Sequence, residues 1–249
     1  GGWKPGQLII LAARPAMGKT AMLLHFAKSA SIAGVPVVIF SLEMEVQALT
    51  NRALLSESEV NSDRFKAGTL STEEETSLCQ AIGQISCLPI SLDDSANISM
   101  QQIKTRAREL RRKGKCGLVL IDYLQLIDMR SINRSYTREQ EVSQCSRAAK
   151  IMAKELGVPV ILLSQLSRQV EGRSDKMPLL SDLRESGAIE QDADIVMFIH
   201  RPEYYSEKAE KGFGVIRIAK QRDGTTGDIR FRYNESLTKI TDYDKELPF

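Results

Sequence analysis

The stretch Ala13-Arg14-Pro15-Ala16-Met17-Gly18-Lys19-Thr20 decides how the rest of this 249-residue sequence is interpreted. An apolar run, Leu8–Ala12, precedes it, and a helical pattern that begins at Ala21 follows it. Strand, loop and helix in this order form the context of a loop that binds phosphates. Its backbone N–H groups and the helix N-terminus both attract anions. We therefore expect residues 13–21 to form a phosphate-binding loop (P-loop) for a nucleoside triphosphate.

Two side chains of this loop have a chemical role. Lys19 is placed to reach the β- and γ-phosphates, and the Thr20 hydroxyl is placed to bind Mg²⁺. Ala13 stands where the first glycine of such loops is usual. Alanine is the next smallest residue, so this position needs a negative φ but tolerates a Cβ. The alternative, a glycine-capped turn with an incidental Lys-Thr pair, is disfavoured by the flanking strand and helix.

Composition sets further limits. The sequence has 34 Lys and Arg against 32 Asp and Glu, so net charge alone does not indicate a nucleic acid partner. No apolar run approaches membrane-spanning length and no signal peptide is seen, so no membrane partner is expected. The cysteines lack metal-binding spacing, which favours reduced thiols and a cytoplasmic location. We expect one domain spanning residues 1–249.

Continuous apolar runs alternate with helical patterns along the chain. Continuous runs are typical of parallel strands buried on both faces. Their alternation with helices predicts an α/β fold, with a mostly parallel twisted sheet flanked by helices. The expected strands are 8–12, 37–41, 118–121, 160–164 and 195–199, and the expected helices are 20–32, 45–56, 72–85, 99–112, 138–156 and 181–191.

The C-terminal part has a different pattern. Apolar and polar residues alternate in 215–220 and 228–233, and Asp223-Gly224 lies between them. This pattern predicts a β-hairpin with one solvated face. A further strand is expected over 237–243, so the sheet ends in antiparallel edge strands.

Three polar residues follow predicted strands at what becomes one edge of the sheet, where open α/β sheets bind ligands. Asp122 ends a buried strand, and a carboxylate at this position is typical of one that holds Mg²⁺. Glu43 is placed to accept a proton from the water that attacks the γ-phosphate; the alternative is a charge at the start of the next helix. Gln165 is placed to contact the γ-phosphate, or is simply a polar strand end.

Basic residues gather in two places outside this edge. The segment 166–180, without obvious secondary structure, carries Arg168 and Arg173, and loops of this length are usually functional. It suits contact with a nucleic acid backbone, with a solvated surface loop as the alternative. Lys220 and Arg222 share one face of the hairpin strand and are expected to point outward. Such cations suit insertion into a neighbour's nucleotide site, or simply protect an edge strand.

Six runs of the sequence stand in a characteristic order: Ala13–Thr20, Phe40–Met44, Ile121–Leu126, Leu163–Arg168, Ser181–Asp194 and Lys220–Gly224. Runs of this kind occur, in this order, in bacterial replicative DNA helicases of the DnaB type. The sequence resembles the C-terminal RecA-like motor domain of that family over essentially all 249 residues.

The resemblance implies a RecA-like P-loop NTPase that forms a homohexameric ring. ATP with Mg²⁺ binds between subunits, and its hydrolysis drives 5′–3′ translocation on single-stranded DNA and duplex unwinding. Glu43 is then the catalytic base, Gln165 the γ-phosphate sensor, and Lys220 with Arg222 the pair that acts in trans. By the same resemblance, Arg52 stacks on the adenine, while Arg184, Glu185 and Gly187 contact the DNA backbone.

The family's N-terminal domain, which contacts primase, is absent from this sequence. We therefore expect an isolated motor domain, with primase and a helicase loader as partners of the full-length protein. Two other functions remain open. One is a RecA-like recombination or repair ATPase, and the other is a non-catalytic, ATP-dependent assembly module of the replisome.

Overall fold

One nine-stranded sheet organises the computed structural model, which describes residues 2–122, 124, 127, 137–183 and 187–243. Its strands lie in the order β3-β2-β4-β5-β1-β6-β7-β8-β9. They are β1 (Leu8–Ala13), β2 (Val37–Ser41), β3 (Ile90–Asp93), β4 (Leu118–Asp122), β5 (Val160–Gln165), β6 (Ile195–His200), β7 (Phe213–Gln221), β8 (Gly227–Asn234) and β9 (Lys239–Asp242).

The first six strands in this order pair in parallel, and the last three are antiparallel. The α/β fold and the antiparallel C-terminal strands expected from the sequence are thus confirmed. β7 and β8 form the predicted hairpin, but β9 is the outermost strand, so the hairpin does not itself form the sheet edge.

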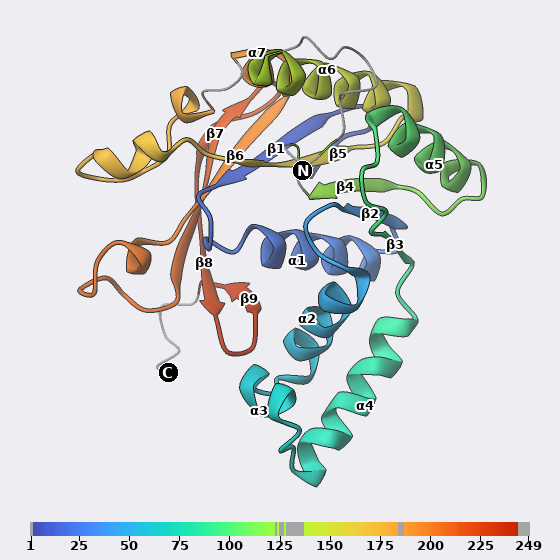
Figure 1. The fold of residues 1–249 in the computed structure, drawn as a ribbon, viewed down its shortest axis with the longest axis vertical. Helices are drawn as coiled ribbons and strands as arrows, with labels where there is room; N and C mark the ends of the chain where they lie inside the picture. The colour runs from blue at the N-terminus through green and yellow to red at the C-terminus, as the bar shows by residue number, and fades with distance from the viewer. Residues whose placement is uncertain (1, 123, 125–126, 128–136, 184–186, 244–249) are drawn as a thin grey trace.

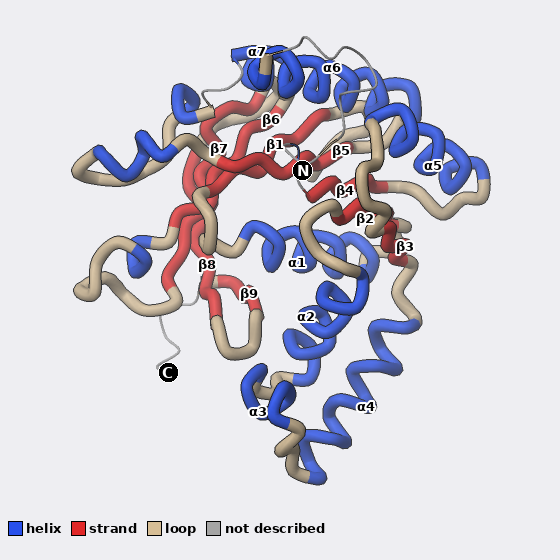
Figure 2. Tube along the Cα trace, in the orientation of Figure 1, coloured by secondary structure: helices blue, strands red, loops and turns tan. Residues whose placement is uncertain are grey.

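Helices cover both faces of the parallel part (Figures 1 and 2). α1 lies against one face, α5, α6 and α7 lie against the other, and α2, α3 and α4 extend away below α1. The helices are α1 (Lys19–Ile32), α2 (Val46–Ser58), α3 (Ser62–Ala67), α4 (Thr72–Ser86), α5 (Met100–Arg112), α6 (Arg138–Leu156) and α7 (Gly187–Asp192). No helix in the described part of the chain is long and apolar enough to cross a membrane.

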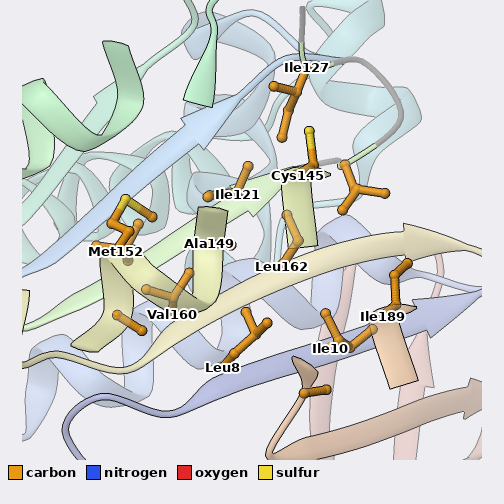
Figure 3. Packing of buried hydrophobic residues seen from close by; sticks show 14 of the residues in the cluster. Leu8, Ile10, Ile121, Ile127, Cys145, Ala149, Met152, Val160, Leu162 and Ile189 are labelled. Carbon is orange, nitrogen blue, oxygen red and sulfur yellow. The ribbon is translucent and has the colours of Figure 1, made fainter. Parts of the chain in front are cut away.

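The position of β1 inside the sheet, with a core cluster on each face, explains why its sequence is apolar at every position. Leu8 and Ile10 belong to the core cluster on the α6 side, where Figure 3 shows them below Ala149 and Met152. Ile9 and the other alternate residues belong to the cluster on the α1 side. Successive side chains of a strand point to opposite faces, so a two-sided core needs a continuous apolar run. This burial fixes the position of the loop that follows β1.

Some sequence-based expectations were wrong. The helix predicted at 181–191 is limited, in the described residues, to α7, because 180–182 form a separate 3-10 helix. There the Asp182 carboxylate accepts a hydrogen bond from Leu179 N at 2.7 Å and pairs with Arg173, which holds that turn in place. The segment expected to lack structure contains the 3-10 helix η2 (Arg168–Gly172), and the sequence did not predict α3 or β3.

Candidate nucleotide-binding site

Four parallel strands bring the predicted site residues to one edge of the sheet. Ala13 at the end of β1 lies in register with Gln165 at the end of β5. Ser41 at the end of β2 lies in register with Asp122 at the end of β4. The P-loop and α1 follow β1, so Lys19 and Thr20 begin α1 at the same edge. As the sequence predicted, polar strand ends and the P-loop converge.

Thr20 and Asp122 are in direct contact. Thr20 Oγ1 donates a hydrogen bond to Asp122 Oδ2 at 2.9 Å. Asp122 is almost fully buried, and its Oδ1 has no hydrogen-bond partner within the described residues. Burial raises the pKa of Asp122, although the bond from Thr20 and the charge of Lys19 oppose this. A buried carboxylate oxygen without a partner, beside a hydroxyl, is favourably placed to bind a cation.

This donor set fits Mg²⁺. The ion prefers oxygen ligands and usually keeps several waters, so it needs only one or two protein groups besides the phosphates of the substrate. Thr20 and Asp122 supply such groups. The described residues contain no cluster of three His, Cys, Asp or Glu side chains that could hold a metal by itself. The geometry therefore suits a cation that arrives with a triphosphate.

Lys19 extends from the start of α1 toward the end of β5. Its Nζ lies 3.5 Å from the carbonyl oxygen of Ser164. Burial lowers the pKa of Lys19, the nearby carboxylates Asp122 and Glu43 oppose this, and the positive charge of Arg14 adds to it. A partly desolvated ammonium gains stabilisation from an arriving anion, which is how a phosphate would bind here.

Glu43 lies in the connection between β2 and α2 and lines the same cleft as Lys19. It does not cap α2, because the helix begins at Val46, whose backbone N–H donates to the carboxylate of Asp94 at 2.8 Å. Glu43 is also exposed to solvent. A carboxylate that lines the same cleft as the P-loop lysine and is open to water has the position expected of a base for an attacking water.

The cleft beside the P-loop has a volume of about 1040 Å³. Besides the residues above, its walls include Arg52 from α2, Gln165 from β5 and Tyr233 from β8. The Arg52 backbone carbonyl accepts a hydrogen bond from the Thr238 hydroxyl at 3.3 Å. A chamber with a phosphate-binding loop at one end and an arginine and a tyrosine on its walls can hold a nucleotide.

Sequence reasoning missed Arg201 and Tyr233. Arg201 follows β6 at the same sheet edge, donates to the carbonyl of Ala16 at 3.3 Å, and lies 4.2 Å from the centre of the Tyr233 ring. Ala16 has φ 64°, a backbone conformation that is uncommon for alanine, and the bond from Arg201 helps to hold it. The signal that identified Asp122, a polar residue at the end of a buried strand, also applies to Arg201.

Arg14 was predicted as a residue of the phosphate-binding loop, and its side chain points away from the cleft. Its guanidinium is buried and bonds to Leu166 O at 2.7 Å and to Glu171 Oε1 at 2.8 and 2.9 Å. It is therefore engaged with the segment after β5 and does not line the cleft. Only the backbone of Arg14 belongs to the phosphate-binding loop.

Lys220 and Arg222 were predicted to point outward; in the single chain both side chains bond to α7, although the side chain of Arg222 remains 48% exposed. The Lys220 ammonium donates to the backbone carbonyl of Glu190 in α7. Arg222 donates to the carbonyl of Gln191 at 2.5 Å and pairs with Asp194 at 3.5 Å. Cations are stabilised at the C-terminal end of a helix by its free carbonyls and its dipole. The two side chains do share one face, as the strand period predicts.

The residues predicted to contact DNA lie in different environments. Arg168 is exposed on η2, as such a contact requires. Arg173 is instead paired with the buried Asp182, through bonds of 2.9 and 2.5 Å. Arg184 and Glu185 lie outside the described residues, and Gly187 is the first residue of α7.

Comparisons with known proteins agree with this geometry. The model of the family described as DnaB-like helicase C-terminal domain matches residues 1–242. The chain is 43% identical to the replicative DNA helicase DnaB of Geobacillus stearothermophilus over 248 residues, covering 99% of this chain and 54% of that protein. It is equally identical, with the same coverage, to the replicative DNA helicase DnaC of Bacillus subtilis. The chain thus spans about half the length of these relatives.

Solved structures extend the likeness to three dimensions. One solved ATPase domain superposes with a TM-score of 0.94 at 41% identity, covering 98% of this chain and 87% of that one. A DnaB-like replicative helicase, whose description includes its interactions with primase, gives the same TM-score at 40% identity and is covered to 59%. The chain therefore belongs to the DnaB-like helicase C-terminal domain family.

Proposed function

We propose that this chain is the ATP-hydrolysing motor domain of a replicative DNA helicase. The observation that carries the proposal is the convergence of Lys19, Thr20, Glu43 and Gln165 around one cleft at the carboxyl edge of the sheet, with the buried Asp122 bonded to Thr20. Family membership supports the substrate and the coupled reaction. A scaffold that only needs to bind ATP requires neither Glu43 nor Arg222.

Each residue then has a task in hydrolysis. The P-loop amides and Lys19 bind the β- and γ-phosphates, and Gln165 contacts the γ-phosphate. Glu43 accepts a proton from the water that attacks the γ-phosphorus, and the bond to the β-phosphate oxygen breaks. Mg²⁺, held by Thr20 and Asp122, neutralises charge on the phosphates when it is bound.

The nucleotide base is proposed to lie farther along the cleft. Arg52 and Tyr233 both line that wall, and planar rings and guanidinium groups stack on bases. Lys220 and Arg222 from another copy complete the site by stabilising the charge that develops on the phosphates. We place the reaction in a homohexameric ring that moves 5′–3′ on single-stranded DNA.

The partners follow from the same proposal. Arg168, and the residues Arg184, Glu185 and Gly187, are proposed to contact the DNA backbone, while primase and a helicase loader bind the full-length protein. Residues 1–249 act as one domain, in the cytoplasm where a bacterial chromosome is replicated.

Steady-state ATP hydrolysis tests the proposal. The rate is measured with and without single-stranded DNA, for the wild type and for Glu43→Ala. The wild type is expected to hydrolyse ATP faster with DNA, and Glu43→Ala to lose about 10²- to 10⁴-fold in rate, as loss of a general base does. Hydrolysis by Glu43→Ala at the wild-type rate would show that Glu43 is not the base. A wild-type rate that DNA leaves unchanged would contradict the motor function.

A further inference from the structure

The P-loop is joined to the segment after β5 by a buried arginine. Arg14 is 8% exposed, and its guanidinium spans two points of that segment. One nitrogen donates to the carbonyl of Leu166 at 2.7 Å, and two others reach Glu171 Oε1 at 2.9 and 2.8 Å. In addition, the backbone N–H of Leu166 donates to the carbonyl of Ala13 at 3.1 Å. The segment is thus held to the P-loop at both ends of 166–171.

Glu171 and Arg168 belong to the same short helix, η2. Val170, between them in sequence, is fully buried in the core cluster on the α6 side, so the helix has one fixed face. Arg168 is exposed and Glu171 is 43% exposed. A displacement of Glu171 therefore displaces Arg168, because one turn of helix connects them.

The segment is also tied together beyond η2. Ser167 N donates to the carbonyl of Asp182 at 3.1 Å, and Arg173 pairs with the Asp182 carboxylate, which is only 3% exposed. These bonds connect the two ends of residues 166–183 to each other. The attachments of this segment to the P-loop are the Leu166 backbone and the Arg14–Glu171 pair.

The charge of Arg14 acts within the phosphate site. Burial is the main reason that the pKa of Lys19 is lowered, and the charge of Arg14 adds to it, so its field reaches the group proposed to bind the β- and γ-phosphates. A bound triphosphate brings several negative charges to this position. These charges compete with Glu171 for the guanidinium, because the strength of a partly buried ion pair depends on the charges around it. A bound nucleotide is therefore expected to change the restraint that Arg14 places on η2.

We propose that Glu171 is a positioning residue that transmits the occupancy of the P-loop, through its ion pair with Arg14, to the segment 166–183 and its DNA-facing Arg168. The inference rests on the proposed function, since it concerns stimulation of hydrolysis by DNA. Glu171 contacts neither the cleft nor the catalytic groups. Loss of Glu171 is expected to reduce the stimulation of hydrolysis by DNA and not the rate of hydrolysis without DNA.

The variant Glu171→Gln removes the charge and keeps the size of the side chain. Without DNA, its rate of ATP hydrolysis is expected to stay within about twofold of wild type. Stimulation by single-stranded DNA is expected to fall by roughly 2- to 30-fold, the range found for residues that carry coupling between sites. Glu155→Gln is the matched control, because Glu155 pairs with Lys104 and Arg108 on the exposed surface, and it is expected to change neither rate.

Hydrogen exchange of residues 166–183, with and without a non-hydrolysable ATP analogue, supplies a readout that needs no catalysis. In the wild type and in Glu155→Gln, the analogue is expected to change exchange in this segment. In Glu171→Gln it is expected to protect the P-loop but to leave the segment unchanged. This difference is not expected if Glu171 only stabilises the fold.

Three results separate the explanations. Full DNA stimulation of Glu171→Gln, or a parallel loss of basal and stimulated rates, overturns the role of Glu171. A nucleotide response of 166–183 that persists in Glu171→Gln also overturns it. A wild type that DNA does not stimulate contradicts the proposed motor function instead, and the exchange experiment then still decides the role of the ion pair.

Discussion

The substitution Asp122→Asn is expected to stabilise the nucleotide-free protein while it removes the response to nucleotide. Asp122 is a buried carboxylate with one partner, Thr20, and its Oδ1 has none within the described residues. Leaving a buried polar atom unpaired costs about 1–3 kcal/mol, and more when the group is charged. Exchanging the charged for a neutral group should therefore recover about 1–2 kcal/mol, which raises the melting temperature by about 2–8 °C for a chain of this size.

A second buried aspartate provides the matched control with the opposite sign. Asp194 is also enclosed, but it is fully paired. Its carboxylate accepts from Lys150 Nζ at 2.5 Å and from Leu8 N at 2.7 Å, and Arg222 lies 3.5 Å away. Removing one partner of a buried ion pair costs about 3 kcal/mol, so Asp194→Asn is expected to lower the melting temperature by about 6–12 °C.

The assay is thermal unfolding of both variants with and without Mg²⁺ and a non-hydrolysable ATP analogue. A ligand present at 100 times its Kd raises stability by about 2.7 kcal/mol, so the wild type should show a clear upward shift. Asp122→Asn should lose most of this shift. A nucleotide-free melting temperature of Asp122→Asn that falls, as for Asp194→Asn, would show that the unpaired oxygen of Asp122 does not destabilise the folded chain.

The contribution of Asp122 to the pH dependence of folding stability has a defined sign. Burial raises the pKa of Asp122 in the folded chain above its ordinary value of 3.8, so the folded state binds the proton more tightly than the unfolded state. Stability therefore falls as pH rises from 3.8 through the folded pKa. Asparagine cannot titrate, so the advantage of Asp122→Asn over wild type should grow across this window and stay constant above it.

Three further predictions concern the P-loop, a helix cap and the subunit interface. Gly18 has φ +88°, a backbone conformation that L side chains rarely adopt, so Gly18→Ala should cost about 1–2 kcal/mol and weaken binding of a fluorescent ATP analogue; unchanged stability and affinity would contradict the strain. Ser99 caps α5 through Gln102 N, so Ser99→Ala should lower stability by about 1 kcal/mol in denaturant titration and leave nucleotide affinity intact. Mixing Arg222→Ala with Lys19→Ala chains should restore some ATP hydrolysis; no rescue in oligomers shown to mix would argue against action in trans.

Local sequence patterns were sufficient to predict the site residues that lie at the carboxyl ends of the strands. Asp122 and Gln165 each end an apolar run, and Glu43 follows another. Parallel strands end at one edge, so strand ends identified separately in sequence meet in space. The P-loop needed no tertiary information either, since its strand, loop and helix are consecutive. The parallel sheet followed from the same apolar runs.

Contacts between distant segments were not predictable in this way. Arg14 meets Glu171, and Arg201 meets Ala16, across more than 150 positions of sequence. A single sequence gives the residue types but not which of many charged residues pair. The short elements α3 and β3 also escaped detection. None of the α3 residues is buried and β3 is only half-buried, so neither has a strong apolar pattern.

The position of Arg222 separates it from the P-loop of its own chain. Its backbone N–H donates to the carbonyl of Asp194, and Asp194 N donates to the carbonyl of Leu8, each at 2.9 Å. Arg222 thus lies level with the start of β1, whereas the P-loop begins at Ala13, at the other end of that strand. At about 3.3 Å per residue, this part of the strand measures about 16 Å.

This separation keeps Arg222 away from the nucleotide-binding cleft of its own chain. An arginine side chain cannot span such a distance while its backbone is fixed beside the start of β6, so we propose that Arg222 acts on the site of another copy. In the single chain, the C-terminal carbonyls of α7 hold Lys220 and Arg222 instead. Triphosphate oxygens carry full charges and are stronger acceptors than helix carbonyls. We therefore expect the rate of hydrolysis per chain to rise with protein concentration as interfaces form.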